Sequence, residues 1–253
     1  MEKIEIFDVG VHVTDFETAL DTVSDWSAQG ASRKVVFCNV HSLMSARNDA
    51  GFLEVLNGAD LVLPDGAPVA FLMRRLGFRR QARISGPDFM WRYLAKARDH
   101  GESLFLFGGT ETTLRALSAR LQEHFPGLRI AGTCSPPFRP PTLEETRAHI
   151  RMIEDSGART VWVSLGCPKQ ERWMMEEGRD IQAILLGVGA AFNYHAGLLP
   201  RAPVWMQSLG FEWAYRLFQQ PGTLWRRYLS TNSQFLYLLF RAFIRKMSGF
   251  SGR

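Results

Sequence analysis

The chain has 253 residues, 46% of them hydrophobic, which suffices for a large core and allows one or two domains. Its longest apolar stretch near the C-terminus, Phe235–Phe240, is far shorter than the ~20 residues that span a bilayer, so we expect no transmembrane helix. The net charge of +5 comes from residues 200–253, which hold eight bases and one acid, whereas the rest holds 22 bases and 24 acids. This asymmetry predicts an anionic partner for the terminal segment, such as a membrane, a nucleic acid or a phosphate.

Short β-rich runs alternate with segments of helical periodicity up to about Gly189. The predicted strands are Lys34–Cys38, Leu61–Leu63, Ser103–Phe107, Arg129–Gly132, Thr160–Ser164 and Ala183–Val188. The predicted helices are Leu53–Asn57, Ala67–Leu76, Asp88–His100, Thr112–His124, Leu143–Ser156 and Lys169–Glu177. This alternation predicts a doubly wound α/β fold with a mostly parallel sheet and helices on both faces.

The C-terminal part of the chain shows no such alternation. Val204–Gln219 and Thr223–Met247 are predicted helices that mix aromatic residues with arginines. We therefore expect an α/β catalytic core, residues 1–199, and a helical C-terminal appendage, residues 200–253. Four apolar residues of the second helix recur at helical spacing, as in a helix that lies in a membrane interface: Trp225, Leu229, Leu236 and Phe240. Packing on the core is the alternative, which explains the aromatic residues but not the scarcity of acids.

Polar residues and glycines follow the predicted strands. In an open α/β sheet, ligands bind beyond the carboxyl ends of the strands, so these residues are the candidate site. They are Asn39-Val40-His41, Pro64-Asp65-Gly66, Gly108-Gly109-Thr110, Gly166–Glu171 and Gly189–Asn193. The sequence predicts that they converge on a single edge of the sheet.

Asp65 is the lone carboxylate of the turn that follows the apolar run Leu61–Leu63. Partial burial would raise its pKa and keep the carboxylate able to accept a proton from a hydroxyl group near neutral pH. Asp65 is therefore the candidate general base. The alternative is an aspartate that only caps the helix beginning near Ala67.

Gly108-Gly109-Thr110, between a strand and a helix, is typical of a turn that cradles a phosphate, because glycine lets backbone amides approach. The turn lacks the trailing glycine of the dinucleotide fingerprint and the Lys-Ser/Thr of a P-loop, which disfavours NAD and ATP enzymes. A contact with a nucleotide or sugar and a plain tight turn both stay open. Further on, Lys169, Gln170 and Glu171 begin a predicted helix and would place long polar side chains at the mouth of the crevice, or in solvent.

The sequence predicts no metal site and no cofactor. It has no Asp-x-Asp pair, and its histidines and three cysteines lack metal-ligand spacing, so we expect reduced thiols. Four arginines of the appendage could instead neutralise a pyrophosphate by bidentate contacts, or meet acidic lipid headgroups: Arg201, Arg216, Arg226 and Arg227.

Eight short motifs occur in a specific order: Ala59–Gly66, Arg83–Asp88, Phe107–Gly109, Leu165–Glu171, Gly187–Ala190, Arg201–Pro203, Glu212–Leu217 and Arg226–Tyr228. Together they resemble the WecG/TagA/CpsF family of bacterial glycosyltransferases, glycosyltransferase family 26. The resemblance implies an inverting, metal-independent hexosyltransferase that uses a UDP-sugar donor and a polyprenyl-pyrophosphate-linked sugar acceptor in surface polysaccharide synthesis. It also implies a cytoplasmic protein, peripheral at the inner face of the cell membrane, with an appendage that docks there and helps close the site.

The same resemblance suggests roles for particular residues. Asp65 would be the base, and Asn39 and Gln170 would contact substrate. Three arginines would meet the pyrophosphate of the donor: Arg216, Arg226 and Arg227. The other candidate substrate-binding residues are Gly66, Asp88, Gly108, Gly109, Lys169, Glu171 and Arg201.

Two positions depart from the family pattern. Phe37 stands where the family often has threonine, which removes a hydroxyl contact, and Asn193 stands where it often has aspartate. The sequence does not say what the second change does, nor does it identify the donor sugar or the acceptor glycan.

Other functions are less consistent with the sequence. A non-catalytic, membrane-recruited protein that binds nucleotide sugars is the main alternative, and the retention of Asp65, Lys169 and Gln170 argues against it. An epimerase or dehydrogenase would need a dinucleotide fingerprint. Nucleic-acid binding is disfavoured because the aromatic residues of the basic segment sit among Leu and Ile.

Overall fold

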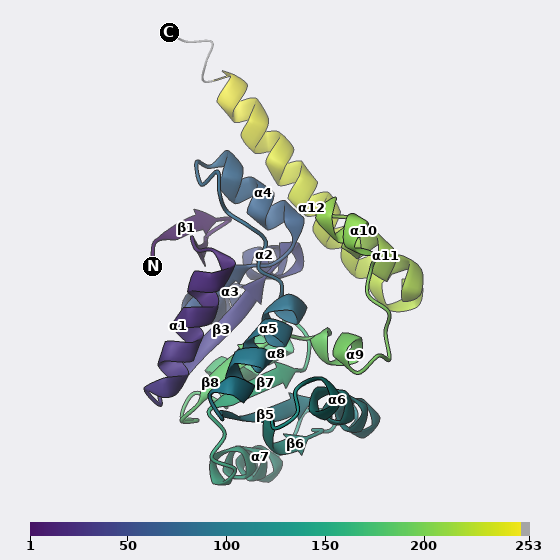
Figure 1. Cartoon of the computed structure of the whole chain (residues 1–253). Helices are drawn as coiled ribbons and strands as arrows, with labels where there is room; N and C mark the ends of the chain where they lie inside the picture. Colours follow the sequence, from purple (N-terminus) through teal and green to yellow (C-terminus); the bar gives the residue numbers. More distant parts are fainter. Residues whose placement is uncertain (249–253) are drawn as a thin grey trace.

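A six-stranded sheet, with every pair of neighbours parallel, forms the centre of the computed structural model (Figure 1). The structure describes residues 1–248, without the side chains of Ser208, Thr223, Arg227, Ala242, Phe243 and 245–248. The strands are β3 (Arg33–Cys38), β4 (Leu61–Pro64), β5 (Ser103–Gly108), β6 (Arg129–Cys134), β7 (Thr160–Ser164) and β8 (Ile184–Gly187). Their spatial order is β4-β3-β8-β7-β5-β6, so all six predicted strands belong to one parallel sheet.

Helices cover both faces of the sheet, as predicted. In β3, Val35 and Phe37 face one hydrophobic cluster while Val36 and Cys38 face another, as the two-residue period of a strand requires. The first cluster is covered by α1 (Phe16–Ala28), α5 (Gly86–Asp99), α6 (Glu111–His124) and α9 (Ala191–His195). The second is covered by α2 (Val40–Asn48), α3 (Ala50–Asn57), α4 (Ala67–Arg75), α7 (Leu143–Asp155) and α8 (Lys169–Met175).

The N-terminal elements were not predicted. Strands β1 (Lys3–Ile6) and β2 (Val9–His12) form an antiparallel hairpin. Its turn, Phe7-Asp8, has φ values of 49° and 70°, a left-handed conformation that the sequence does not announce with a glycine.

The C-terminal part consists of three helices, α10 (Val204–Ser208), α11 (Glu212–Gln219) and α12 (Pro221–Ser248). The prediction of one helix over Val204–Gln219 is wrong, because Gly210, with φ of 80°, turns the chain between α10 and α11. The prediction of a long last helix is confirmed. Within residues 1–248, no helix combines the length and apolarity needed to cross a membrane.

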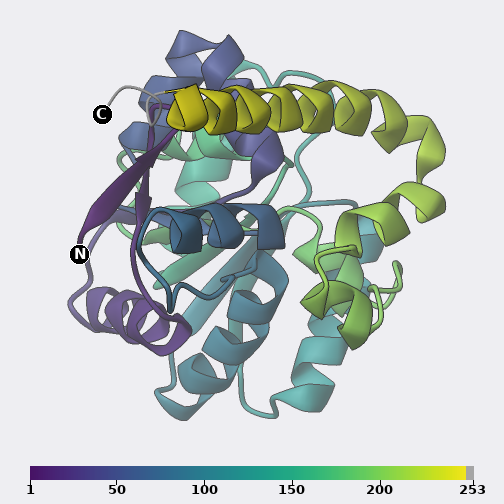
Figure 2. The same ribbon diagram turned by 90° about the horizontal axis from the view of Figure 1, so that it is seen from above.

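Helix α12 lies against the core along α2. The side-chain amides of Asn48 and Gln234 exchange two hydrogen bonds of 3.0 and 2.9 Å, and Phe235 packs edge-on against Phe7. Figure 2 shows the molecule from above, that is, from the end where the C-terminal helices lie. Helix α12 runs along one side, α10 and α11 lie beyond its start, and α4 lies nearer the centre. The C-terminal helices and α4 therefore surround the carboxyl edge of the sheet.

Candidate active site

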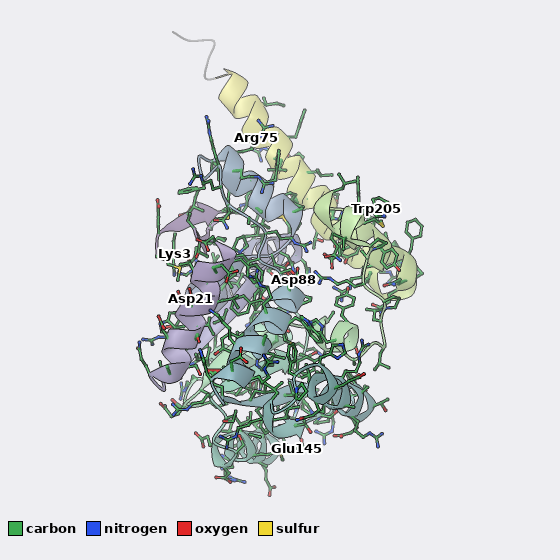
Figure 3. All side chains as sticks on the ribbon, in the orientation of Figure 1. Lys3, Asp21, Arg75, Asp88, Glu145 and Trp205 are labelled. Atoms are coloured by element: carbon green, nitrogen blue, oxygen red, sulfur yellow. The ribbon has the colours of Figure 1, made fainter. Side chains whose placement is uncertain are left out.

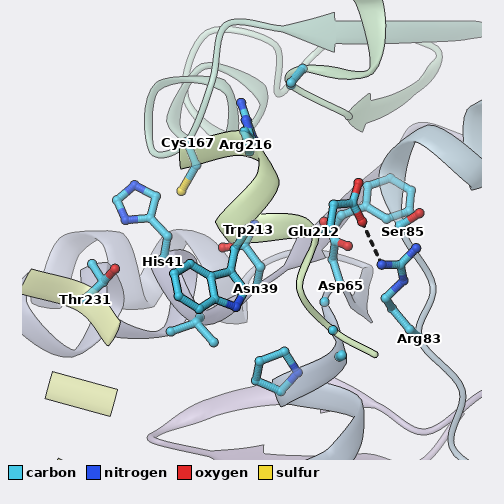
Figure 4. A pocket seen from close by; sticks show the side chains of 18 of the residues that line it. Asn39, His41, Asp65, Arg83, Ser85, Cys167, Glu212, Trp213, Arg216 and Thr231 are labelled. Carbon is cyan, nitrogen blue, oxygen red and sulfur yellow. Dashed lines mark hydrogen bonds and ion pairs between the residues drawn. The ribbon is translucent and has the colours of Figure 1, made fainter. Parts of the chain in front are cut away.

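A cavity of about 720 Å³ lies beyond the carboxyl ends of four neighbouring strands, β4, β3, β8 and β7. The core contributes residues that follow these strands: Asn39, His41, Asp65, Gly66, Gly166, Cys167, Gln170, Glu171 and Gly189. Helices α11 and α12 close the other side with Glu212, Trp213, Arg216, Tyr228, Thr231 and Phe235. Figure 4 labels four of these residues, Glu212, Trp213, Arg216 and Thr231. The cavity is within the range of ligand sites, about 300–1,000 Å³.

Asp65 is held at the end of β4 by its backbone. Its N–H donates to the carbonyl of Cys38 in β3 at 2.8 Å, and Gly66, with φ of 88°, turns the chain into α4. Gly66 is the cap residue of α4, and no side chain caps that helix. The alternative that Asp65 serves as a helix cap is therefore wrong.

The Asp65 carboxylate is half-buried in the cavity and accepts no hydrogen bond from another described residue. Burial raises its pKa to about 7, and the charges of Glu212 and Asp88, which raise it, work against those of Arg83 and Arg201, which lower it. Figure 4 shows Asp65 beside the Arg83–Glu212 ion pair. A carboxylate with this pKa can accept a proton near neutral pH.

Four charged side chains form a neutral network next to Asp65. Arg201 makes a bidentate pair with Asp88 at 2.5 and 2.9 Å and also reaches Glu212 at 3.2 Å. Arg83 contacts Glu212 at 2.8 Å and Asp88 at 3.3 Å. Burial alone would raise the pKa of Asp88, but its bonds with Arg201 and Ser85 and the charge of Arg83 hold it down to about 2.

This network changes the expected roles of two predicted residues. Asp88 and Arg201 line a second hollow, of about 630 Å³, rather than the cavity that contains Asp65. The two residues form an ion pair with each other, Asp88 also pairs with Arg83, and Arg201 also pairs with Glu212. The network links α5 to α11, so its visible role is to hold the C-terminal helices against the core.

Asn39 lies where the sequence predicts, at the end of β3. Its Oδ1 accepts from the backbone N–H of Ser42 at 3.2 Å and caps α2. No described residue accepts a hydrogen bond from its Nδ2, so Asn39 has an amide donor left for a ligand in the cavity.

Gln170 and Glu171 line the cavity, whereas Lys169 is exposed and does not line it. Gln170 accepts from the N–H of Gly166 at 3.2 Å and donates to the Gly187 carbonyl and to Glu171 at 3.0 and 2.8 Å. Gln170 therefore ties together the ends of β7 and β8. Glu171 is fully buried, its Oε2 has no hydrogen-bond partner, and burial raises its pKa.

Gly108 and Gly109 do not line the cavity, contrary to the expectation that all the strand ends share one site. Gly108 is the last residue of β5 and Gly109 follows it, and β5 lies beyond β7 on the side of the sheet away from β3 and β4. A Cβ on Gly108 would come within 2.4 Å of the Ser164 carbonyl oxygen, and φ is 110°. Close packing against β7 thus explains this glycine without a ligand.

The structure separates the predicted arginines. Arg216 of α11 lines the cavity, and its buried Nε has no hydrogen-bond partner. Arg226 does not line the cavity; its exposed guanidinium lies 5.2 Å from the ring centroid of Trp225. The side chain of Arg227 is outside the described part of the structure.

Several cavity residues were not predicted as site residues: Arg83, Ser85, Glu212, Trp213 and Tyr228. Arg83 and Ser85 precede α5, and the others belong to the C-terminal helices. The motifs Arg83–Asp88 and Glu212–Leu217 contained the signal, because both place charged or aromatic residues beside glycine or a helix start. Of the two departures, Phe37 is buried against Phe89, and Asn193 accepts a hydrogen bond from Thr113 outside the cavity.

Among the residues described, no group of three His, Cys, Asp or Glu side chains is placed to hold a metal ion. The open parallel sheet, the cavity at its carboxyl edge and a carboxylate with a pKa near 7 define an α/β enzyme site that can take a proton from a nucleophile.

The chain belongs to the WecG/TagA/CpsF family of glycosyl transferases, which it matches over residues 4–249, and it is a glycosyltransferase. It is similar to an N-acetylglucosaminyldiphosphoundecaprenol N-acetyl-beta-D-mannosaminyltransferase of Bacillus subtilis (strain 168). The two are 29% identical over 193 residues, which cover 76% of this chain and 73% of the relative.

Proposed function

We propose that this glycosyltransferase moves a hexose or N-acetylhexosamine from a UDP-sugar to a sugar linked to polyprenyl pyrophosphate. The single observation that carries the proposal is the Asp65 carboxylate, which lines a cavity of about 720 Å³ and has a pKa of about 7. The activity in the name of the Bacillus subtilis relative, which transfers to a polyprenyl-diphosphate-linked sugar, supports the substrate class.

In the proposed reaction, a hydroxyl of the acceptor sugar attacks the anomeric carbon of the donor. The new carbon–oxygen bond forms as the bond to UDP breaks, and the hydroxyl proton passes to Asp65. UDP leaves with the electron pair of the broken bond. Attack from the face opposite UDP inverts the configuration at the anomeric carbon.

Arg216 is the described residue best placed to meet the diphosphate of UDP. It lines the cavity, its Nε has no partner, and it takes part in no ion pair with another described residue. Arg83 and Arg201, by contrast, are already neutralised by Asp88 and Glu212. A guanidinium free to form charge-assisted hydrogen bonds would stabilise the negative charge that develops on the leaving group.

The proposal also assigns the C-terminal appendage, residues 200–253, a role at the inner face of a cell membrane. Exposed apolar side chains of α12 support this assignment: Trp225, Leu229, Leu236, Tyr237 and Phe240. The opposite side of α12 packs on the core through Leu224 and Phe235. An apolar face that is not used for packing suits insertion among lipid headgroups.

The test is a transfer assay that pairs a panel of UDP-sugars with a short-chain polyprenyl-pyrophosphate-linked N-acetylglucosamine. We expect a product heavier by one sugar for at least one donor, detected by mass spectrometry, and little donor hydrolysis without acceptor. UDP release that is independent of acceptor would indicate a hydrolase. Donor binding without turnover for any pair would indicate a non-catalytic binding protein and contradict the proposal.

A further inference from the structure

The segment between Asp65 and Asp88 is strongly basic, unlike the rest of the core. It contains five arginines and no acid. Arg83 is paired with Asp88 and Glu212, and Arg74 donates to the carbonyl of Gln81 at 2.9 Å. The other three arginines, Arg75, Arg79 and Arg80, are exposed and form no ion pair with a described residue. The core therefore carries its own concentrated positive patch.

Exposed apolar side chains lie beside these arginines. Phe71 is 48% exposed and Leu76 50% exposed, and the Arg75 guanidinium lies 5.1 Å from the ring centroid of Phe71. We call Phe71, Arg75, Leu76, Arg79 and Arg80 the α4 surface. Apolar side chains flanked by arginines are the composition that binds the interface of an anionic membrane.

The α4 surface borders the cavity. Phe71 and Arg74 line the cavity from α4, and Leu236 and Leu239 line it from α12. Figure 2 shows both helices at the end of the molecule that overlies the carboxyl edge of the sheet. In Figure 3, Arg75 lies at this end, as does Trp205 of α10, whereas Glu145 of α7 lies at the opposite end. The cavity thus opens between two elements that each expose apolar residues.

We propose that the α4 surface binds anionic lipid headgroups, so that the core and α12 contact the same membrane on two sides of the cavity mouth. The inference rests on the proposed function in one respect, because a lipid-linked acceptor has to reach Asp65 from the bilayer. Contact on both sides of the mouth would let the acceptor headgroup enter the cavity while its polyprenyl chain stays among the lipids. The apolar members of the surface favour a membrane over a nucleic acid as the occupant.

The test compares full-length wild type with the triple variant Arg75→Gln, Arg79→Gln, Arg80→Gln, in which α12 is unchanged. None of the three residues lines the cavity. The matched control replaces Arg115, Arg147 and Arg151 by Gln; these are exposed arginines of α6 and α7 without ion pairs among the described residues. Sedimentation with phosphatidylcholine vesicles, with and without phosphatidylserine, measures membrane partitioning, and circular dichroism verifies folding.

Each arginine near an anionic surface contributes about fivefold to partitioning, so we expect the α4 variant to bind anionic vesicles at least tenfold more weakly. The control should bind like wild type, and raising the salt concentration should reduce the difference. Equal binding of all three proteins, or equal losses in the two variants, would overturn the inference. So would a loss of binding to RNA or DNA with vesicle binding intact.

An activity measurement separates this inference from the proposed function. If both hold, the α4 variant transfers sugar to a short-chain, water-soluble acceptor at the wild-type rate but loses activity with a long-chain acceptor embedded in vesicles. If wild type transfers to neither acceptor, the proposed function fails, and vesicle binding still decides the role of the α4 surface.

Discussion

The core and the C-terminal helices line opposite sides of the same cavity, and they do so by different means. On the core side, Asn39 and Asp65 follow parallel strands whose backbones are joined by hydrogen bonds, and Gln170 fastens two strand ends below them. On the other side, Trp213 and Arg216 belong to a short helix connected to the core largely through the ion pairs of Glu212 and Arg201.

This difference separates two tasks that the cavity has to perform. The strand ends provide fixed positions for a proton acceptor, which has to lie within hydrogen-bond reach of the acceptor hydroxyl. The helical side provides an arginine and aromatic rings that cover whatever binds there. We therefore expect changes on the core side to affect turnover, and changes on the helical side to affect binding as well.

The largest effect is expected for Asp65→Asn on the core side. Asparagine keeps the shape of the side chain but cannot accept the proton, and general-base catalysis typically contributes about 10²–10⁴-fold to the rate. We expect kcat to fall by about that factor, with little change in donor affinity measured by calorimetry. Asp49→Asn is the matched control, because exposed Asp49 caps α3 and pairs with half-buried Arg172 outside the cavity, and asparagine caps as well.

If a folded Asp65→Asn protein turned over at the wild-type rate, Asp65 would not be the base, and the claim that the core side supplies the proton acceptor would be wrong. A fall in donor affinity as large as the fall in kcat would also count against it, because Asp65 would then be a binding residue.

A smaller effect is expected for Arg216→Gln on the helical side. Hydrogen bonds to charged groups are worth about 1.5–3 kcal/mol, so the loss of a contact with the diphosphate should lower kcat/KM by about 10–100-fold. Arg226→Gln is the matched control, because Arg226 is exposed outside the cavity, over Trp225. Steady-state kinetics with a water-soluble acceptor should show the control within about twofold of wild type. Similar losses in both variants would show that Arg226, too, reaches the substrate.

The smallest effect is expected for Glu171→Gln, which tests the support beneath the core side. Burial raises the pKa of Glu171, so the folded protein holds this proton at pH values where the unfolded chain has released it, and stability falls as pH rises above about 4.5. Glutamine carries no such proton, so urea denaturation should show that the free energy of unfolding of the variant rises relative to that of wild type as the pH increases from 5 to 7.5.

The exposed Glu154→Gln is the control for this measurement and should change stability equally at both pH values. A constant difference between Glu171→Gln and wild type across this range would mean that burial of Glu171 does not shift its titration.

The sheet and most of its flanking helices could be predicted because buried parallel strands are continuous apolar runs, such as Val35–Cys38 and Leu61–Leu63. The β1–β2 hairpin could not, because its four-residue strands meet at Phe7 and Asp8 rather than at a typical turn sequence. Helices α1 and α2 were not predicted either. The cap of α2, Asn39, is a polar residue directly after a strand, and the sequence suggested a loop at that position.

The candidate site was predictable only as far as strand ends define it. Asp65 and Asn39 converge because β3 and β4 are neighbours, but the order that puts β5 two strands from β8 is not visible in the sequence, so Gly108 was placed in the same site. Arg83 and Glu212 form an ion pair across 129 residues, and only the fold brings them together.

The pH dependence of kcat/KM tests the central claim, that Asp65 is the base, most directly. The pKa of Asp65 is raised from its usual value to about 7 by burial, and only the deprotonated carboxylate can accept the proton. For wild type we predict a plateau above pH 8 and a fall approaching tenfold per pH unit below about 7. The residual activity of Asp65→Asn should lack this acid limb. An acid limb that persists in Asp65→Asn, or a wild-type profile that is flat from pH 5.5 to 8.5, would contradict the assignment.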